Sequence, residues 1–508
     1  MRPKSHRPPA AGGVLVPPPS DRGRHNAAMA PYDPLSGAEV ERLIGAALCL
    51  LRQTGCAFEP GTEAIELFEA AGCTVDAQGV VRFPTAVVEA ALASTPRAVR
   101  LWNRDASGSI LLDAEHTWFI PGMTAIKVYD PDSGERRSST GDDLAMIVRL
   151  ADALPNIDAV CVACKDVPNS DIHGEINEFA TLIRNTAKPL EYLCEDARSL
   201  QVVIEMATAV RGSAAALAEK PYFLQIVTPL PLGFWRTHSD QIIAGARAGI
   251  PLSIGTLPIG GASAPITMAG CMVSSLATDF AAMTLGQLAR HGAFVIGSSD
   301  VRFMEPATGG LGNLPHTTLA DITMHQVRRH LGLPSFSGVS GRAVARRFNQ
   351  DAVWEISTSM TQAFFSRPAT LDYLGLIDDG ISFSMHALCL CDELAGLLRT
   401  MWRGVTIDDD TLALGLIDAV GPRGNFLAQR HTASHCRDQR WPARYFGVHI
   451  PVSVGLQPDL DLLERIDADL RLLLATHRPP PLAAELDATL SAIQARFFAC
   501  EQRSAAVG

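Results

Sequence analysis

Aromatic and hydrogen-bonding side chains follow several β-rich segments of this sequence. One such segment ends at Thr228 and is followed by Phe234 and Trp235, and another ends with Asp372 and Tyr373. Aromatic faces combined with a few carboxylates suit a cation that cannot donate hydrogen bonds, so these side chains predict a pocket for such a ligand. The alternative is that Phe234 and Trp235 pack beneath a loop. Further polar groups at the ends of such segments are Lys165, Asp166, Glu195, Asp196 and Ser298 to Asp300.

A glycine-rich stretch, TLPIGGASAPITMAG, spans residues 256–270. Gly260 and Gly261 would let the backbone approach a ligand closely, because glycine carries no side chain. Ser263 and Pro265 predict the start of the next helix, whose free N–H groups would then face the same ligand. A tight turn without a ligand is the alternative.

The cysteines predict core packing more than chemistry. Cys161 and Cys164 fall in one predicted strand, where residues three apart point to opposite faces, so both are expected in the core and not on one metal. Cys389 and Cys391 are expected in a buried helix. Without a signal peptide, the cysteines read as reduced thiols of a cytoplasmic protein.

Two histidines near the C-terminus have a spacing that can ligate zinc. His431 and His435 lie one helical turn apart, and Cys436 follows directly. The stretch is rich in arginine and has no carboxylate ligand nearby in the sequence, so we predict structural histidines and no metal site.

The most common catalytic signatures are missing from the sequence. It contains no GxSxG elbow, no HExxH motif, no P-loop and no dinucleotide fingerprint after a strand. Hydrolase, kinase and dehydrogenase functions therefore lose most of their support.

Eight β-rich runs, most of them separated by helical patterns, recur roughly every 30 to 40 residues from residue 117, as βα units require. Eight is the count that closes a (β/α)8 barrel, so we predict an α/β fold of the TIM-barrel type, with an open doubly wound sheet as the alternative. Ligands bind at the carboxyl end of barrel strands, which would place the polar groups and the glycine-rich stretch at one mouth. The runs are 117–130, 157–167, 188–196, 221–229, 250–258, 292–300, 333–341 and 369–378.

The remaining segments suggest four parts of the chain. Residues 1–35 are rich in Pro, Gly and Arg and are predicted to be a disordered tail. Residues 36–105 contain three short helical patterns and predict a helical cap. The barrel would occupy residues 106–450, and residues 451–508 would form a C-terminal helical tail.

Composition limits the partners. A net charge of −11 argues against nucleic acid as the main partner, and 47% hydrophobic residues are typical of a globular protein with a large core. The stretch from Ala248 to Thr278 has no charged side chain, but its prolines and glycines divide it into pieces too short to span a membrane. We therefore expect no membrane partner.

The sequence from about residue 37 to about residue 450 resembles the trimethylamine-corrinoid protein methyltransferase family, whose members without pyrrolysine include the glycine betaine-corrinoid protein methyltransferases. The segments that carry the resemblance are GCAFEPGTEAIELFEAAGCTVD, VRFPTAVVEAALASTP, LWNRD, GASAPITMAG, LGQLARHGAFVIGS and DELAGLLRTMWRGVTIDDDTLALGLIDAVGPRGNFLAQRHT. The resemblance implies a TIM barrel that passes a methyl group from a methylated amine to the cobalt of a separate corrinoid protein.

The resemblance also implies how the mouth would be used. The corrinoid belongs to the partner protein, so this chain is expected to bind no cofactor tightly, and a homo-oligomer is left open. Reduced Co(I) is itself the nucleophile, so no nucleophilic side chain is required and no catalytic residue is assigned. The corrinoid-facing rim would comprise Gly260, Gly261, Ser263, Ser298 and Ser299, and the substrate site Thr228, Phe234, Trp235, His316, Asp372 and Tyr373.

Several positions depart from the family pattern and indicate a divergent, betaine-type member. No residue reads as pyrrolysine, Thr278 stands where an acidic residue is usual, and Pro315–His316 replaces a pair ending in Glu. The stretch GRAVARRFNQDAVWE, with Arg346, Asn349 and Asp351, also differs from that pattern. The alternative function is a catalytically silent barrel that binds a small cationic metabolite or a protein partner. A mouth filled by Arg342, Arg346 and Arg347 would favour it.

Overall fold

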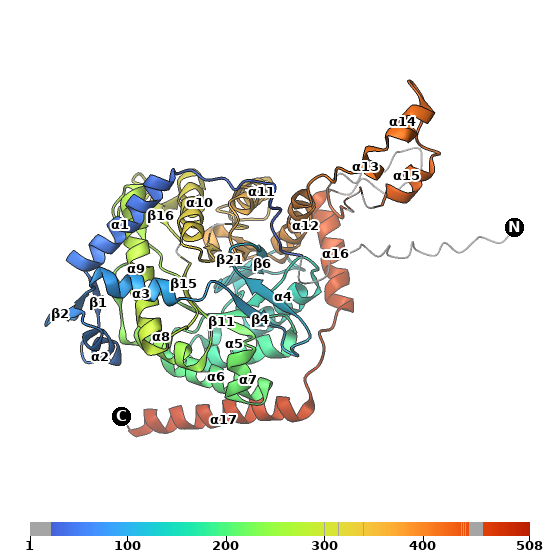
Figure 1. Ribbon diagram of the computed structural model, residues 1–508. Coiled ribbons are helices and arrows are strands. Elements are labelled where there is room, and N and C mark those ends of the chain that lie inside the picture. Colours follow the sequence, from blue (N-terminus) through green and yellow to red (C-terminus); the bar gives the residue numbers. More distant parts are fainter. Residues whose placement is uncertain are drawn as a thin grey trace.

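Eight parallel strands, each followed along the chain by a helix, form the centre of the computed structural model (Figure 1). Every one of them lies within a run that the sequence predicts as a strand, so that prediction is confirmed. The structure describes residues 22–298, 300–312, 314–338, 340–437, 439, 441, 443–446 and 461–507. In chain order the pairs are β6 (Trp118–Pro121) and α4 (Gly141–Ala153), β9 (Val160–Cys161) and α5 (Ile172–Asn185), β10 (Leu190–Tyr192) and α6 (Ala197–Arg211), β11 (Phe223–Val227) and α8 (Arg236–Ala248), β13 (Leu252–Ile254) and α9 (Met268–Ala289), β15 (Val295–Gly297) and α10 (Leu314–His330), β18 (Phe336–Ser337) and α11 (Gln350–Phe365), and β19 (Thr370–Leu374) and α12 (Met385–Trp402).

Strand pairing runs almost completely around the ring. One parallel sheet has the order β15-β13-β11-β10-β9 and a second has the order β18-β19-β6. The amide of Asp158, before β9, donates to the carbonyl of Phe119 in β6 at 2.8 Å and joins the two sheets.

The ring stays open at one seam, between β15 and β18, which form no ladder in the described part of the chain. The side chain of Asp300 packs against Gly338 there: a Cβ added to Gly338 would lie 3.0 Å from the Cβ of Asp300. The fold is therefore α/β and barrel-like, and the predicted full closure by strand pairing is not seen.

The barrel strands are short apolar runs buried on both faces. All residues of β11 and β13 are buried, as expected for parallel strands with side chains inside the ring on one face and helices on the other. Side chains cap several of the surrounding helices. Thr140 and Asp143 form a capping box at the start of α4, and Asp171 accepts from the first amides of α5.

Two small sheets extend from the loops at the carboxyl end of the strands. The loops after β13 and β15 form the order β14-β16-β17, and those after β19 and β6 form β20-β21-β7-β8. β7 and β20 lie within the predicted β-rich runs 117–130 and 369–378, and the other five short strands were not predicted. Their bounds are β14 (Ile259–Gly260), β16 (Arg302–Met304), β17 (Leu311–Gly312), β20 (Leu376–Ile377), β21 (Ser382–Phe383), β7 (Lys127–Tyr129) and β8 (Arg136–Ser138), and 3-10 helices lie at Val167–Asn169 and Asp378–Gly380.

The segment before the barrel contains the three predicted helices and also strands. α1 (Gly37–Gln53) and α3 (Thr85–Ser94) pack against α9 at the side of the barrel, and α2 (Glu63–Ala70) packs against α8 and α9 (Figure 1). Mixed pairing in the order β12-β1-β3-β2 ties this segment to the loop after β11. These strands are β12 (Gly233–Phe234), β1 (Cys56–Phe58), β3 (Val80–Arg82) and β2 (Thr74–Val75), and a hairpin of β4 (Val99–Trp102) and β5 (Ser109–Leu112) follows.

Residues 22–35 are not the disordered tail that composition predicts. The ring of His25 stacks on that of Trp402 with centroids 5.0 Å apart, and its Nε2 lies 2.7 Å from the hydroxyl of Thr117. The amide of Tyr32 donates to Phe365 at 3.1 Å. Composition reports only that few apolar side chains are available, whereas this segment is held by backbone and ring contacts. The rest of the predicted tail, residues 1–21, lies outside the described residues.

The chain after the barrel is helical where it is described. α16 (Leu462–Thr476) packs on α12 and α4, and α17 (Ala484–Val507) lies along α5 and α6 at the bottom of Figure 1. Between α12 and α16, a segment with the short helices α13, α14 and α15 projects from the body. Their bounds are Asp409–Leu412, Leu414–Val420 and Arg430–His435, and the remaining helix, α7 (Ala214–Glu219), follows α6.

In the described part of the chain, one helix, α9, is long and apolar enough to cross a membrane by composition alone. Within the structure 78% of that apolar window is buried, against α1, α3, α8 and β15. A core helix of this kind passes the same compositional test, so α9 is explained by packing.

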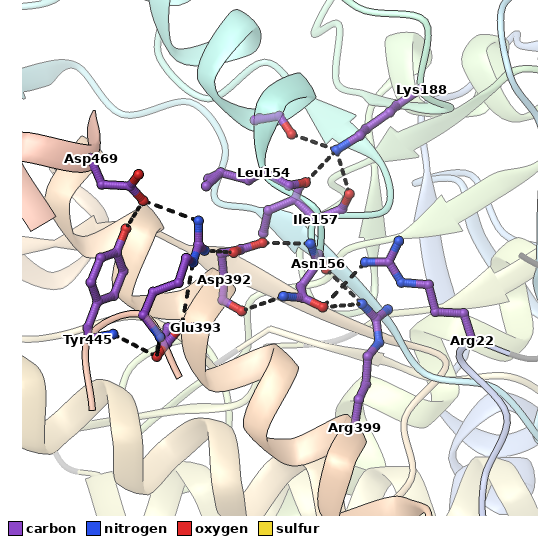
Figure 2. A network of polar contacts seen from close by, with 12 residues as sticks. Arg22, Leu154, Asn156, Ile157, Lys188, Asp392, Glu393, Arg399, Tyr445 and Asp469 are labelled. Carbon is purple, nitrogen blue, oxygen red and sulfur yellow. Dashed lines mark hydrogen bonds and ion pairs between the residues drawn. The ribbon is translucent and has the colours of Figure 1, made fainter. Parts of the chain in front are cut away.

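Polar contacts at the amino end of the barrel join segments that are far apart in the sequence (Figure 2). The ammonium group of Lys188, before β10, donates to the carbonyl oxygens of Leu154 and Ile157 at 2.8 and 2.7 Å. Burial lowers the pKa of Lys188 to about 8. Carbonyl oxygens thus replace the water that this amine loses on folding.

Two carboxylates on or beside α12 complete this network. Asp392 accepts from the amide of Asn156 at 2.6 Å. Arg399, also on α12, pairs with Asp158, and the guanidinium of Arg22 lies 3.9 Å from the same carboxylate. The network therefore connects the first described residues, the loop before β9 and the last barrel helix.

We expect Asp158→Asn to destabilise the protein strongly. The change leaves Arg399 buried without its counter-charge, and breaking a buried pair in this way costs ~3–5 kcal/mol. The free energy of unfolding from a denaturant titration measures the effect. Asp132→Asn is the matched control, because Asp132 pairs with Arg471 but has a side chain that is 80% exposed. Equal effects of the two substitutions would contradict the assignment.

Candidate functional site

The backbone is strained where β19 ends, at the carboxyl end of the barrel. Tyr373, Asp378 and Asp379 have φ angles of 64°, 55° and 54°, in the left-handed region that disfavours residues with a side chain. The register of β19 against β6 also shifts between Leu371 and Leu374. Strained residues and bulges concentrate at functional sites, where they re-aim side chains. This segment is therefore where a site is expected.

Two carboxyl groups, Glu191 on β10 and Asp372 on β19, are buried inside the ring. Side chains alternate along a strand, and Tyr192, next to Glu191, points outward and donates to the carbonyl of Glu175 on α5. Leu371, next to Asp372, is paired in register with Phe119, whose ring faces Phe364 on α11. Both carboxyl groups consequently face the interior, and their residues are only 2% and 5% exposed.

Burial makes these carboxyl groups unusually weak acids. It raises the pKa of Glu191 to about 8. Burial, together with the nearby charge of Glu191, raises the pKa of Asp372 well above its ordinary value. The hydroxyl of Thr370 donates to Oδ2 of Asp372 at 3.0 Å. Oδ1 of Asp372 and Oε2 of Glu191 have no hydrogen-bond partner among the described residues.

The ionisation of such a pair of carboxyl groups can change when a cation binds nearby. With a pKa of about 8, Glu191 is largely protonated near pH 7, and burial without a basic partner inside the ring shifts the pKa of Asp372 in the same direction. A cation entering the ring would favour their ionised forms and lower both pKa values. The interior therefore holds negative charge that becomes available when a cation binds.

A cluster of opposite charges lies nearer the mouth. Arg302 on β16 forms two short contacts with Asp300, at 2.6 and 2.7 Å, and lies 3.6 Å from Asp379. Arg342, after β18, lies 3.9 Å from Asp300 and 3.6 Å from Asp379. Its guanidinium also stands over the ring of Tyr373, 5.7 Å from the centroid. Burial raises the pKa of Asp300 to about 7 in spite of Arg302.

Four of the predicted substrate and rim residues lie on barrel strands or just beyond their carboxyl ends. Asp372 and Tyr373 belong to the groups just described. Thr228 and Ser298 flank Gly255, where an added Cβ would lie 3.7 Å from Cγ2 of Thr228 and 3.5 Å from the hydroxyl of Ser298. The carboxyl ends of β11, β13 and β15 thus meet at small side chains.

The two predicted aromatic residues of the pocket are placed elsewhere. Phe234 is 3% exposed and its ring stacks on that of Phe58 with centroids 4.5 Å apart, so it packs the core of the segment before the barrel. The loop turns this way because Phe234 pairs in register with Phe58 of β1. Trp235 is 60% exposed at the start of α8. The alternative of packing beneath a loop is correct for Phe234, and the aromatic pocket is not formed by this pair.

His316 and the glycine-rich stretch also have local roles. His316 is exposed in the first turn of α10, with its ring centroid 6.3 Å from that of Phe303. A Cβ on Gly260 would lie 2.7 Å from Phe303, and Gly261 has a φ of 91°, so a tight turn requires both glycines. Whether they also face a corrinoid stays a prediction.

The prediction that Ser263 and Pro265 begin the next helix is wrong. α9 begins at Met268, after Thr267, and not at Ser263 and Pro265. The hydroxyl of Ser263 accepts from the amide of Ile259 at 2.9 Å and closes the turn instead. Ser299, the last residue of the predicted rim, lies outside the described residues.

The three arginines that would favour the silent barrel if they filled the mouth separate into two groups. Arg342 lies at the site, with a side chain that is 12% exposed. Arg346 and Arg347 line a separate cavity of about 870 Å³, together with Tyr129, Asp378 and His386. A second cavity, of about 700 Å³, lies between α6 and α17. Within the described part of the chain, neither cavity is lined by the predicted rim residues Gly260, Gly261, Ser263 and Ser298.

Sequence reasoning missed Glu191, Arg302 and Asp379. Glu191 is the one charged residue in the apolar run PLEYLC, and a charge inside a buried strand is a signal that could have identified it. Arg302 and Asp379 lie in loops that only the fold brings together. The predicted core cysteines are confirmed: Cys161, Cys164, Cys389 and Cys391 are all buried.

We expect Glu191 to make stability fall as the pH rises. Its pKa is raised from 4.5 to about 8 on folding, so the folded protein keeps a proton that the unfolded chain has lost. The contribution is complete below about pH 4.5 and disappears as the pH rises through 8, with a slope of at most about 1.4 kcal/mol per pH unit.

Glu191→Gln should remove this slope. Denaturant titrations between pH 5 and 8 measure it, and Glu115→Gln is the control, because the side chain of Glu115 is 70% exposed. An unchanged slope in Glu191→Gln would show that the carboxyl group is not held protonated.

Comparison with known proteins identifies the family of this chain. A family model described as trimethylamine methyltransferase (MTTB) matches residues 20–499. The trimethylamine methyltransferase MttB of Desulfitobacterium hafniense (strain DSM 10664 / DCB-2) is 29% identical over 468 residues, which cover 90% of this chain and 92% of that protein. The glycine betaine methyltransferase of Desulfitobacterium hafniense (strain Y51) is 26% identical over 472 residues, which cover 92% and 97%.

Among solved structures, the monomethylamine methyltransferase (MtmB) of Methanosarcina barkeri aligns with a TM-score of 0.48 and 12% identity over 88% of each chain. The family model spans nearly the whole sequence, including the segment before the barrel, α16 and the larger part of α17. The predicted resemblance is thus confirmed, and the chain belongs to the trimethylamine methyltransferase (MTTB) family of methyltransferases.

Proposed function

We propose that this protein moves a methyl group from a quaternary or other methylated amine, betaine-like in structure, to the Co(I) of a separate corrinoid protein. Membership of the family supports the reaction class. Two relatives that cover almost the whole chain are named for trimethylamine and for glycine betaine, and both of these compounds carry methyl groups on nitrogen.

The observation that carries the proposal is the buried pair of Glu191 and Asp372. Each has one carboxyl oxygen without a hydrogen-bond partner among the described residues. An orphaned buried polar atom is costly and calls for an explanation. A quaternary ammonium group explains it well, because it cannot donate hydrogen bonds but brings a positive charge that stabilises both ionised carboxylates.

Arg342 favours a betaine over a simple amine. Its guanidinium is mostly buried, but its nearest carboxylate oxygens are 3.6 and 3.9 Å away, so its hydrogen-bonding capacity is not exhausted by Asp300 and Asp379. Guanidinium groups bind carboxylates in a planar, bidentate manner. A zwitterion could therefore place its ammonium group toward the inner carboxylates and its carboxylate toward Arg342.

The methyl acceptor would approach from the carboxyl end of the strands. Gly255, Thr228 and Ser298 place small residues beside Ile226 where three strands end, which suits a broad, flat ring such as a corrinoid. The corrinoid would supply a reduced cobalt that is itself a strong nucleophile. The residues of this chain then need only hold the cation, exclude water and orient one methyl group.

A catalytically silent barrel that binds a small cation is the second candidate. One observation favours it: Arg342 already covers the ring of Tyr373 and partly fills the mouth. Arg346 weakens this reading, because its side chain is 89% exposed and its Nε lies 3.7 Å from Oδ1 of Asp378.

Methyl transfer to cobalt separates the two candidates. We expect the protein, mixed with glycine betaine and cob(I)alamin under reducing conditions, to form methylcobalamin and dimethylglycine, followed by absorbance and by mass spectrometry. Trimethylamine and tetramethylammonium complete the panel of donors. Binding of a methylated cation without any methyl transfer, to free cobalamin or to a corrinoid protein, would support the silent barrel and contradict the proposal.

Substitutions of single residues test which side chains bind the methylated cation. Asp372→Asn should weaken binding of glycine betaine by at least about tenfold, or 1.4 kcal/mol, because it removes one of the two inner charges. Arg342→Ala should weaken binding of glycine betaine but not of tetramethylammonium, which has no carboxylate. Trp235→Ala is the control and should change neither affinity, because Trp235 lies outside the ring. A loss of affinity only in Trp235→Ala would instead restore the aromatic pocket.

The affinity for the cation should rise with pH. The ionised form of Glu191 binds a cation, and with a pKa of about 8 its ionised fraction increases about tenfold between pH 7 and pH 9. Dissociation constants measured by calorimetry across this range should fall accordingly, and Glu191→Gln should flatten the profile. A flat profile in the unsubstituted protein would contradict the role given to Glu191.

A further inference from the structure

The segment from residue 403 to residue 437, here called the arm, projects from the body of the protein at the upper right of Figure 1. None of its helices, α13, α14 and α15, contains a buried residue. Val405 and Leu427 are 84% and 81% exposed. Small folded units without a core need another source of stability, and a bound metal is a common one.

Three side chains with metal-binding atoms meet in the arm. Nε2 of His435, in the last turn of α15, lies 3.2 Å from Oδ2 of Asp410 on α13. Nε2 of His431, one turn earlier, lies 3.3 Å from the backbone carbonyl of Asp410. The two imidazole rings are only 4.3 Å apart between centroids.

The sequence interpretation had set these histidines aside because no carboxylate is near them in the sequence. The fold supplies one: Asp410 comes 21 residues before His431, and the turns between α13 and α15 bring it back. Two histidines at positions i and i+4 share a helix face, and a carboxylate from a second helix completes three ligands.

The separations fit a small divalent ion. Bonds of roughly 2.0 to 2.2 Å in a tetrahedron place the ligand atoms about 3.3 to 3.6 Å apart. One potential ligand atom from each of the three side chains lies within 4.8 Å of the others, and one pair is at 3.2 Å. Imidazole nitrogen and carboxylate oxygen together are ligands that zinc accepts, with water in the fourth position.

We propose that Asp410, His431 and His435 bind one divalent transition-metal ion of the zinc class, which fastens α15 to α13 and fixes the shape of the arm. The site is separate from the barrel interior and does not depend on the proposed function. Its role is structural. Methyl transfer to free cobalamin does not require it.

Metal content tests the proposal directly. The full-length protein is stripped with a chelator, dialysed against zinc chloride and analysed for bound zinc by mass spectrometry, with calorimetry for affinity. We expect about one equivalent to bind, and His431→Gln, His435→Gln and Asp410→Asn each to weaken binding by more than about tenfold, since even loss of a residue that supports a ligand costs ~10–100-fold in affinity. All three positions are at the surface, so the variants should fold.

Matched controls make the result decisive. His291 is exposed elsewhere on the protein, and His291→Gln should keep the full equivalent of zinc. Cys436→Ser should also keep it, because the thiol of Cys436 lies against the carbonyl of Ala433, 3.6 Å away in its own helix. Absence of zinc binding in the unsubstituted protein, or equal binding in the three ligand variants, would overturn the proposal. So would loss of zinc in Cys436→Ser.

A second readout follows the arm itself. Val405 and Leu427 lie in exposed chain, so limited proteolysis should cut the metal-free arm faster than the zinc-loaded arm. In His435→Gln, zinc should give no protection. Equal cleavage with and without zinc in the unsubstituted protein would contradict the fastening role.

Discussion

The cost of taking charge out of water shapes both ends of this barrel. At the amino end, Asp158 and Asp392 are deeply buried, and each has an arginine partner. At the carboxyl end, Glu191 and Asp372 are just as deeply buried without one, and their pKa values rise. Ion pairs offset part of the desolvation penalty at the amino end, where burial still raises the pKa of Asp392 against the charge of Arg444, and protonation offsets it at the carboxyl end. The first arrangement stabilises the fold, and the second leaves a site that can change charge.

The charged groups are arranged in a definite order along the barrel axis, and this order can orient a ligand. Protonatable carboxyl groups lie on the strands inside the ring, and Arg302 and Arg342 lie beyond the ends of the strands with Asp300 and Asp379. The strained backbone at Tyr373 holds the ring under Arg342 and places Asp372 inward at the adjacent position. A ligand with positive charge at one end and negative charge at the other would match this order.

The sequence located all eight barrel strands, because strands buried on both faces are short apolar runs set apart by helical patterns. It missed the strands of two or three residues in the loops, such as β12 and β14, since so few residues carry no periodicity. The direction of the loop after β11 could not be predicted from the sequence either, because β12 pairs with β1, which is far away in the chain. This pairing places Phe234 beside Phe58. Residues 22–35 look disordered by composition, but Arg22 and His25 find partners that only the fold supplies.

The site was predicted in part. Asp372 and Tyr373 were recognisable as polar residues at the end of a strand, whereas Glu191 was read as part of the strand itself. Spatial neighbours that are distant in sequence, such as Asp410 beside His435, could not be inferred from spacing. Sequence periodicity reports which face of an element is buried, and it does not report which polar groups meet there.

The central claim is that a methylated cation exchanges for a proton on Glu191 and Asp372. Calorimetry of glycine betaine binding at pH 7, repeated in buffers with different ionisation enthalpies, counts the protons released on binding. With a pKa of about 8 for Glu191, the account predicts that the unsubstituted protein releases protons on binding and that Glu191→Gln releases about one proton fewer. Tight binding with no proton released would contradict it.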